Sequence, residues 1–584
     1  MNIHTSIRKL SLLFITLFIA LSGGLVYWQV VVAQQVTANI HNNRHCLADA
    51  APIRGRIFDR KGRLLAYSER SSKATCGYVR HYIEPSLANL IGYYISPLFP
   101  ATGIEKEYDQ YLSGQRGLTL LNNTINQTLH RPPVGDDIYL TIDLDIQRIV
   151  KHAFDTYVAT PEGRNIFATH RGSVVVTDPH TGEILALLSC PGYNTNRNPA
   201  GDTSDCSGYD PNRIAAGDLN YFHILETDPS QPLLERPLQF RTVPGSTYKT
   251  FTLLAGLDSG HANLSDLYYN DHNPDHPQAI GPIVVGRGDE TETIGPVGNN
   301  LCCYTKRYPV SLAYGFVHSD NIIFAQVGVS TGAQSWLDYS SRFYVGKQIP
   351  FDLPVAVSTV LPAGKTHLGV NQLAENSFGQ GVDFVTPFQM SLFDDAIANN
   401  GTLMKPWLVW KVVQPDHPTD PAHPTDLKDI FCGPVTQNAN ELDGQITPCG
   451  TEVQTVSPQE LGTPISQQTA SQVRDAMYGV VRCGSGSIVP ELYNSPWAII
   501  AKTGTGEVGG GNHAMAWLLT QAPYRDPKLT IVGMKENGGE GGYVDGPMIA
   551  HMYNDIYSNV LKLPLPQAPD PQYPYCFDNG LLQA

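Results

Sequence analysis

The stretch TVPGSTYKTF, residues 242–251, places a serine and a lysine three positions apart directly after a Pro-Gly pair. On a helix, Ser246 and Lys249 would share one face, so their side chains could touch. A serine hydroxyl is a weak nucleophile until a base takes its proton, and a desolvated lysine can be that base. The alternative is an ordinary helix N-terminus, with Ser246 as a cap and Lys249 in water. Because Ser6 and Lys9 have the same spacing in an apparent N-terminal tag, the motif alone does not choose between the two.

Two later stretches favour the nucleophile. HSDNIIF (318–324) contains the triplet Ser319–Asn321, and IIAKTGTGE (499–507) contains Lys502–Thr505 after an apolar run that predicts a strand. Alone, an S-D-N triplet is typical of a turn or a helix cap, and K-T-G is typical of a strand end. In this chain order, S-x-x-K, S-D-N and K-T-G are the signature of penicillin-binding proteins and class A β-lactamases.

The resemblance to penicillin-binding transpeptidases extends over nearly all of residues 50–560. The segments that carry it are Arg54–Ser68 (similar to RGxIxDRxGxxLA), Gly172–Pro191 (similar to DPxTGExLAxxSxP), Glu235–Lys249, Ser377–Met390, Ala396–Pro406 and Asn512–Trp517. No run between the apolar N-terminal segment and this region is long enough for a glycan polymerase domain. The chain therefore resembles a class B, monofunctional protein. Tyr248 and Asp320 depart from the commoner family residues without removing a reactive group.

The resemblance implies an α+β fold: a central antiparallel sheet flanked by helices, an all-helical subdomain, a small N-terminal pedestal and one transmembrane helix. The expected segments are a cytoplasmic N-terminus (1–9), a transmembrane anchor (10–32), a pedestal or dimerisation-like domain (33–135), a penicillin-binding transpeptidase domain (136–565) with polar insertions near 264–300 and 413–455, and a Pro-rich tail (566–584).

Local patterns predict several elements independently of the resemblance. Residues 61–62 are typical of a hairpin turn between two short strands, and residues 172–188 of a hairpin that turns at 178–182. Residues 101–117 have one apolar helical face. The stretch 138–142 predicts a strand that leads into a helix capped by Asp143. Strands and helices in this order favour an α+β domain with one central sheet.

In the mechanism that the resemblance implies, Ser246 attacks the carbonyl between the last two residues of a stem peptide ending in D-Ala-D-Ala and forms an acyl-enzyme. A neutral, desolvated Lys249 takes the hydroxyl proton. Ser319 relays a proton to the leaving amine, and Asn321 holds the substrate amide.

The third motif is expected to bind the substrate. Lys502 supplies positive charge for the terminal carboxylate, and Thr503 and Thr505 supply hydroxyl groups. Gly504 is expected to let the strand approach the ligand closely. The backbone N–H groups of Ser246 and Thr505 are expected to form the oxyanion hole, assisted by the dipole of the helix that follows Ser246.

Charge and hydropathy limit the possible partners and location. The net charge of −15 and the absence of a basic stripe argue against a nucleic-acid partner. The run Leu10–Val32 is uncharged and long enough to cross a bilayer. Arg8 and Lys9 precede it and the next basic residue is Arg44, so the positive-inside rule predicts a cytoplasmic N-terminus and an extracytoplasmic catalytic part. A cleaved signal peptide is the competing interpretation.

Ten cysteines fit an extracytoplasmic chain in which disulfides can form. Cys190 with Cys206, and Cys432 with Cys449, bracket loops and are plausible pairs. Their spacing shows no metal-binding pattern, so neither a metal nor a cofactor is expected.

The resemblance, together with the apolar run, implies a membrane-anchored peptidoglycan D,D-transpeptidase of the bacterial cell membrane, which β-lactams would acylate and which could have carboxypeptidase side activity. A membrane glycan polymerase is the partner that a class B resemblance implies. No glutamate between Asn321 and Lys502 is convincingly placed to activate a hydrolytic water. One alternative is a β-lactam-hydrolysing or sensing protein, although a sensor would need a cytoplasmic signalling portion and only nine residues precede the apolar run. The other alternative is a catalytically idle scaffold.

Overall fold

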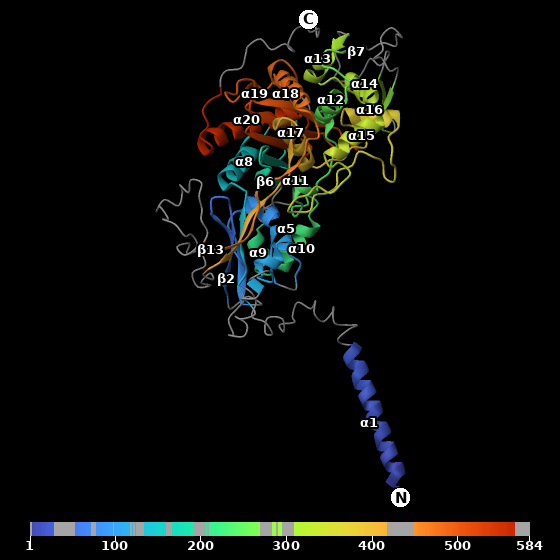
Figure 1. The fold of residues 1–584 in the computed structure, drawn as a ribbon, viewed down its shortest axis with the longest axis vertical. Coiled ribbons are helices and arrows are strands. Elements are labelled where there is room, and N and C mark those ends of the chain that lie inside the picture. The colour runs from blue at the N-terminus through green and yellow to red at the C-terminus, as the bar shows by residue number, and fades with distance from the viewer. Residues whose placement is uncertain are drawn as a thin grey trace.

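A computed structural model describes most of the chain: residues 3–27, 53–71, 77–96, 99–116, 119–120, 123, 134–158, 166–190, 206, 210–268, 283–287, 290–294, 309–416 and 449–566. Much of the two expected polar insertions and almost all of the Pro-rich tail lie outside these residues. Figure 1 shows two adjoining regions that each contain a sheet. We call the sheet that includes β5 and β6 the central sheet, and the sheet that includes β1 to β4 the pedestal sheet.

The central sheet has five antiparallel strands in the order β15-β16-β17-β5-β6. Its strands are β5 (Gly172–Asp178), β6 (Glu183–Cys190), β15 (Ile500–Gly506), β16 (Met515–Ala522) and β17 (Leu529–Lys535). The hairpin expected over 172–188 is confirmed, and so is the pairing of the strand after 512 with the K-T-G strand. Since β15 is an edge strand, one side of the K-T-G motif is left without a partner strand within the sheet.

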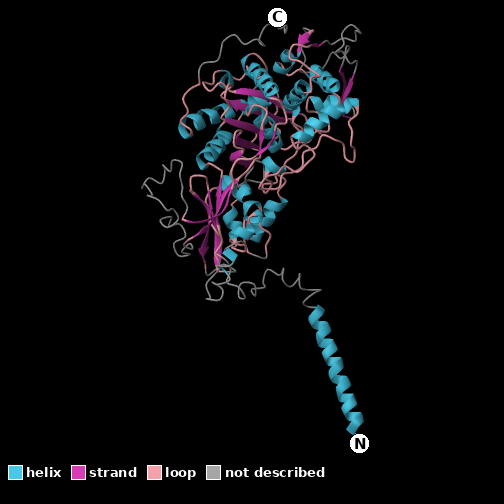
Figure 2. Cartoon of the chain, in the orientation of Figure 1, coloured by secondary structure: helices cyan, strands magenta, loops and turns pink. Residues whose placement is uncertain are grey.

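Helices cover both faces of the central sheet (Figure 2). Successive side chains of a strand point to opposite faces, and accordingly Val174 and Val176 lie in one apolar core whereas Val175 lies in the other. The helices α8 (Leu144–Thr156) and α20 (Gly541–Asp555) pack on the first face. The helices α17 (Pro387–Ala398) and α18 (Gln467–Arg482) pack on the second.

A group of helices beyond the second face lies where we expected an all-helical subdomain, but short strands also pack against it. Its members are α12 (Lys249–Asp258), α13 (Leu312–Val317), α14 (Asn321–Thr331), α15 (Ala333–Arg342) and α16 (Val370–Ser377). The helix α12 packs against both α14 and α18, so it joins this group to the central sheet.

The pedestal sheet has six strands in the order β13-β12-β4-β1-β2-β3. They are β1 (Ile57–Phe58), β2 (Leu64–Arg70), β3 (Tyr78–Tyr82), β4 (Asp137–Leu140), β12 (Val409–Pro415) and β13 (Gly450–Thr455). The last two strands come from the C-terminal half of the chain: β12 pairs with β4, and β13 pairs with β12. The sequence did not predict this return, because 413–455 was interpreted as a polar insertion.

The expected apolar helix at 101–117 is present as two short helices, α5 (Gly103–Glu107) and α6 (Asp109–Leu112), and its apolar face is buried. The remaining described elements are η2 (Pro85–Leu87), α4 (Ala88–Ile91), α9 (Pro211–Ala215), α10 (Leu219–Thr227), α11 (Arg236–Gln239), η3 (Gly245–Tyr248), β7 (Leu267–Tyr268), β8 (Ile283–Arg287), β9 (Glu290–Ile294), β10 (Val310–Ser311), β11 (Leu403–Met404), β14 (Glu460–Gly462), α19 (Pro490–Tyr493) and η4 (Ile556–Val560).

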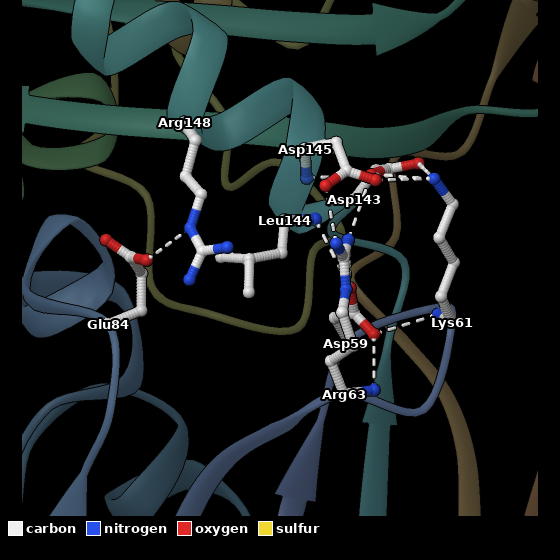
Figure 3. Close-up of polar contacts among 8 residues, drawn as sticks. All are labelled: Asp59, Lys61, Arg63, Glu84, Asp143, Leu144, Asp145 and Arg148. Carbon is white, nitrogen blue, oxygen red and sulfur yellow. Dashed lines mark hydrogen bonds and ion pairs between the residues drawn. The ribbon is translucent and has the colours of Figure 1, made fainter. Parts of the chain in front are cut away.

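A cluster of charges connects the pedestal hairpin to the start of α8 (Figure 3). The carboxylate of Asp59 accepts hydrogen bonds from the backbone N–H groups of Lys61 and Arg63, at 2.9 and 2.8 Å, and so shapes the predicted turn. The Arg63 guanidinium reaches Asp145 at 2.5 Å, and the Lys61 ammonium reaches the same residue at 2.9 Å. Asp143 caps α8 as predicted, since its side chain accepts a hydrogen bond from the backbone N–H of Asp145. The cluster therefore fixes the first turn of a helix that supports the central sheet.

The predicted pairing of Cys190 with Cys206 is confirmed, and this disulfide ties the end of β6 to the segment that follows. Cys449 and Cys483 each take part in a disulfide as well. Cys432, the expected partner of Cys449, lies outside the described residues.

The helix α1 (Ile3–Val26) covers most of the run for which we expected a membrane anchor. The last residues of the apolar run, 28–32, lie outside the described part of the chain. No helix among the described residues combines the length and the apolar character required to cross a membrane.

Candidate active site

The first motif lies on a tight turn against the K-T-G strand. Ser246 is part of the 3₁₀ turn η3, and α12 begins at Lys249. Gly245 has a φ of +55°, and a Cβ on it would lie 2.2 Å from the carbonyl oxygen of Thr505. Only glycine fits both the backbone conformation and this distance. The Pro-Gly pair therefore brings the half-buried Ser246 beside β15.

Contacts from two other segments hold the residues before Ser246 in place. Thr242 and Val385 exchange two backbone hydrogen bonds, at 3.0 and 3.1 Å. The N–H of Gly245 donates to the carbonyl of Gly379 at 2.9 Å. On β16, the buried indole of Trp517 donates to the carbonyl of Val243 at 3.0 Å. These bonds leave the nucleophile little freedom to move relative to the central sheet.

Lys249 is fully buried, which excludes the alternative of a lysine pointing into water. Its Nζ lies 3.0 Å from Ser246 Oγ, 2.7 Å from the carbonyl oxygen of Ser319 and 2.5 Å from Asn321 Oδ1. The last two atoms can only accept hydrogen bonds. A neutral amine would give its two protons to them and keep its lone pair for the hydroxyl proton of Ser246. The arrangement therefore suits a general base that activates Ser246.

Ser319 connects the two lysines of the motifs. Its Oγ lies 3.2 Å from Lys249 Nζ and 2.9 Å from Lys502 Nζ. Ser319 has a φ of +61°, a conformation that residues with a Cβ adopt at a cost. Asp320 caps α14 by accepting from the backbone N–H of Ile323, so the S-D-N triplet is both a helix cap and a part of the site.

The third motif contributes side chains to both faces of β15. Lys502 is fully buried and also donates to the carbonyl oxygen of Thr503 at 2.9 Å. The Thr503 hydroxyl lies 2.7 Å from the Ser485 hydroxyl. Thr505 is half-buried, and its carbonyl accepts a hydrogen bond from the Gln380 side chain at 2.9 Å. The structure therefore brings all eight predicted residues, Ser246, Lys249, Ser319, Asn321 and Lys502–Thr505, to one place.

Gly504 lies against the turn that carries Ser246. A Cβ on Gly504 would lie 2.7 Å from the Cγ2 methyl of Thr247 and 3.0 Å from the carbonyl oxygen of Pro244. The glycine thus makes room for the turn that carries Ser246, and the expected close approach of a ligand to Gly504 stays a prediction.

Sequence reasoning missed three residues of the site. Gln380 lies in the stretch Ser377–Met390, which resembles the family, but no local sequence pattern indicates its hydrogen bond to Thr505. Ser485 lies in the glycine-rich stretch CGSGS (483–487), which reads as an ordinary loop. Trp517 is buried opposite Gly504 in the β15–β16 pair. Each contact joins residues that are more than ten positions apart, so no spacing rule could find it.

The site holds the groups that nucleophilic acyl transfer needs: a serine hydroxyl, an amine in contact with it, a second hydroxyl and a second lysine. No group of three or more histidine, cysteine or acidic side chains able to hold a metal ion is found in the described part of the chain.

Comparison with known protein families gives two matches. Residues 172–558 match the penicillin binding protein transpeptidase domain, and residues 54–138 match the penicillin binding protein A dimerisation domain. The second match covers most of the region 33–135 that we expected to be a pedestal or dimerisation-like domain, extends three residues beyond it and ends in β4.

Individual proteins are similar over most of their length. The peptidoglycan D,D-transpeptidase PbpA of Mycolicibacterium smegmatis is 27% identical over 557 residues, which cover 93% of this chain and 97% of that protein. The peptidoglycan D,D-transpeptidase MrdA of Escherichia coli is 25% identical over 498 residues, which cover 79% of this chain and 64% of MrdA. The solved penicillin G acyl-enzyme complex of penicillin-binding protein A from M. tuberculosis superposes with a TM-score of 0.65 at 25% identity, covering 86% of this chain and 99% of that one.

Proposed function

This chain belongs to the penicillin-binding proteins, as a class B-like peptidoglycan D,D-transpeptidase, and on that premise we propose that it cross-links stem peptides through an acyl-serine intermediate at Ser246. The observation that carries the proposal is the position of Lys249. Its amine contacts Ser246 and Asn321 directly, and Ser319 connects it to Lys502. The buried Lys249 amine can act as a base for the half-buried Ser246 hydroxyl. Lys502, which the Ser319 hydroxyl links to Lys249, can bind a carboxylate, so the site suits a peptide that ends in one.

The acylation step follows from these contacts. Lys249 takes the proton of Ser246 as the oxygen attacks the carbonyl carbon of the penultimate D-alanine. The peptide bond breaks, and the terminal D-alanine leaves as an amine that receives a proton through Ser319. The backbone N–H groups of Ser246 and Thr505 stabilise the oxyanion, a contribution of about 3–4 kcal/mol for one donor in other enzymes.

The second step determines the product. The amine of a neighbouring stem peptide attacks the acyl-enzyme, forms the new peptide bond and releases Ser246. Water in place of the amine would give the carboxypeptidase side reaction. A β-lactam would acylate Ser246 in the same way and mimic the first step, as the penicillin G acyl-enzyme complex of the M. tuberculosis protein illustrates.

We also propose that residues 10–32 anchor the protein in the bacterial cell membrane, with the catalytic part outside the cytoplasm. The uncharged run behind Arg8 and Lys9 supports this orientation. Leu12, Phe14 and Phe18 on α1 are 62%, 64% and 71% exposed, so the described part of the chain leaves their apolar surface largely uncovered. The Cys190–Cys206 disulfide suits an oxidising compartment. Removal of residues 1–34 should release the protein from membranes into the soluble fraction, and retention in the membrane would contradict the anchor.

A class B-like protein polymerises no glycan, so a glycan polymerase in the same membrane is the partner that we propose. Co-purification of the full-length protein from membranes with such a polymerase would support the pairing, and a cross-linking activity that needs no glycan synthesis in cells would argue against it.

The experiment that tests the proposed reaction supplies a D-Ala-D-Ala-ending peptide together with an amine acceptor. Mass spectrometry separates the transfer product from the hydrolysis product. We expect Ser246-dependent transfer that grows with acceptor concentration, and none from Ser246→Ala. Hydrolysis alone would indicate a carboxypeptidase, and the absence of both products from folded protein would indicate a scaffold.

A further inference from the structure

Ser485 is the residue outside the three motifs whose hydroxyl touches the K-T-G strand. It lies in the loop between α18 and α19, and its Oγ is 2.7 Å from Thr503 Oγ1. Either oxygen can donate in this pair. Thr503 is about 9% exposed, and Ser485 is half-buried.

The loop around Ser485 is tightly fixed. The N–H of Ser485 donates to the carbonyl of Val317 at 3.1 Å, two residues before Ser319. A Cβ on Gly484 would lie 2.0 Å from that same carbonyl oxygen, so only glycine allows the contact. Gly486 donates to Val480 at 2.9 Å, and Cys483 is held by a disulfide. Ser485 is therefore attached to both the S-D-N segment and the K-T-G segment.

A hydroxyl group has one proton to donate. If Thr503 donates to Ser485, its proton is not available for a substrate. If Ser485 donates to Thr503, the Thr503 proton is free to point toward a negatively charged group. An approaching carboxylate accepts hydrogen bonds only, so it favours the second arrangement. The start of α20 adds to this preference. A Cβ on Gly542 would lie 3.1 Å from the Thr503 methyl, which places the positive end of the helix dipole near the pair.

We propose that Ser485 is a positioning residue: by donating to Thr503, it directs the Thr503 hydroxyl proton toward the terminal carboxylate of the substrate. The inference rests on the proposed function, because it assumes that an acyl donor with a carboxylate binds beside Lys502 and Thr503. It adds to that function a determinant of substrate charge supplied from a loop outside the three motifs.

The test compares two acyl donors in the full-length protein: benzylpenicillin, which has a carboxylate, and its methyl ester, which does not. The variants are Ser485→Ala, Ser485→Thr and Ser487→Ala. Ser487 lies in the same loop and donates to the Gly484 carbonyl at 2.8 Å, so it is a matched control. The measurement is the second-order rate constant for acylation of Ser246, from intact-protein mass spectrometry.

We expect Ser485→Ala to slow acylation by benzylpenicillin roughly 3- to 12-fold, the range for a lost hydrogen bond between two neutral groups. Acylation by the methyl ester should change by less than about threefold, since no charged acceptor is present. Ser485→Thr keeps a hydroxyl and should restore most of the rate, and Ser487→Ala should behave as the wild-type protein.

An equal loss with both donors would show that Ser485 only supports the loop and would overturn the inference. So would an unchanged rate with benzylpenicillin. Failure of the wild-type protein to be acylated by either donor would instead overturn the proposed function itself, which makes the two failures distinguishable.

Discussion

Replacement of Ser319 separates its chemical role from its conformational cost. Its hydroxyl lies 3.2 Å from the Lys249 amine and 2.9 Å from the Lys502 amine. Its backbone has a φ of +61°. Ser319→Ala and Ser319→Gly both remove the hydroxyl, but only the glycine variant relieves the left-handed conformation.

The magnitudes follow from these two observations. A positioned proton donor contributes about 10²- to 10⁴-fold to the rate of a step. Both variants should therefore acylate with penicillin about 10²- to 10⁴-fold more slowly, which corresponds to roughly 3–5 kcal/mol of the barrier. A Cβ at positive φ costs about 1–2 kcal/mol, and glycine loses about 0.5–1 kcal/mol through its unfolded-state entropy. The free energy of unfolding of Ser319→Gly should consequently be about 1 kcal/mol higher than that of Ser319→Ala, so the glycine variant should be the more stable of the two.

The assay is a time course of labelling by a fluorescent penicillin, followed by urea unfolding of the same proteins. Ser330→Ala is the control, since Ser330 lies on α14 and its hydroxyl donates to the Val327 carbonyl within that helix. It should change neither property appreciably. Labelling of both Ser319 variants within about threefold of the wild-type rate would refute the proton relay. Recovery of labelling by glycine alone would show that the backbone, not the hydroxyl, limits the reaction.

Four further expectations concern the site and its support. Lys502→Ala should reduce acylation by a carboxylate-bearing β-lactam at least tenfold while Ser246 stays in place, and a normal rate would contradict the carboxylate role. Gly504→Ala would place a methyl 2.7 Å from Thr247, so we expect a loss of about 1–3 kcal/mol in urea unfolding together with slower acylation; wild-type values for both would show that the turn can move aside. Burial raises the pKa of Asp395 to about 7, so the folded chain keeps a proton that the unfolded chain releases near pH 4, and stability should fall as pH rises from about 4 to 7. Asp395→Asn should flatten that slope, and an unchanged slope would assign it to other groups. Arg63→Ala leaves the buried Asp59 carboxylate without its guanidinium partner and should cost about 1–3 kcal/mol in urea unfolding at neutral pH, whereas a change below about 0.5 kcal/mol would mean that the cluster contributes little.

The residues that sequence could predict are those whose geometry is local. Ser246 and Lys249 are near each other because they are three residues apart on a turn that leads into a helix, and the hairpin of β5 and β6 follows from a five-residue turn. Asp143 caps α8 for the same local reason. The convergence of the three motifs came from the resemblance, and the structure adds the distances between them.

The features that sequence did not predict depend on contacts between distant segments. The strand β12 joins the pedestal sheet by pairing with β4, about 270 residues earlier in the case of Val412 and Ile138, and β13 joins it by pairing with β12. Ser485 reaches Thr503 only because its loop is fixed to Val317. Gly504 was predicted to allow the close approach of a ligand, and the turn that bears Ser246 also lies close to it. No local pattern specifies which partner occupies such a space.

The central claim is that Ser246 is the acylated nucleophile. The most direct measurement is intact-protein mass spectrometry after incubation with benzylpenicillin, with peptide mapping of the adduct, for the wild-type protein and Ser246→Ala. We predict one stable adduct of the mass of the intact antibiotic, located on the peptide that contains Ser246 and absent from the variant. An adduct on another residue, or an equal adduct on folded Ser246→Ala, would contradict the account.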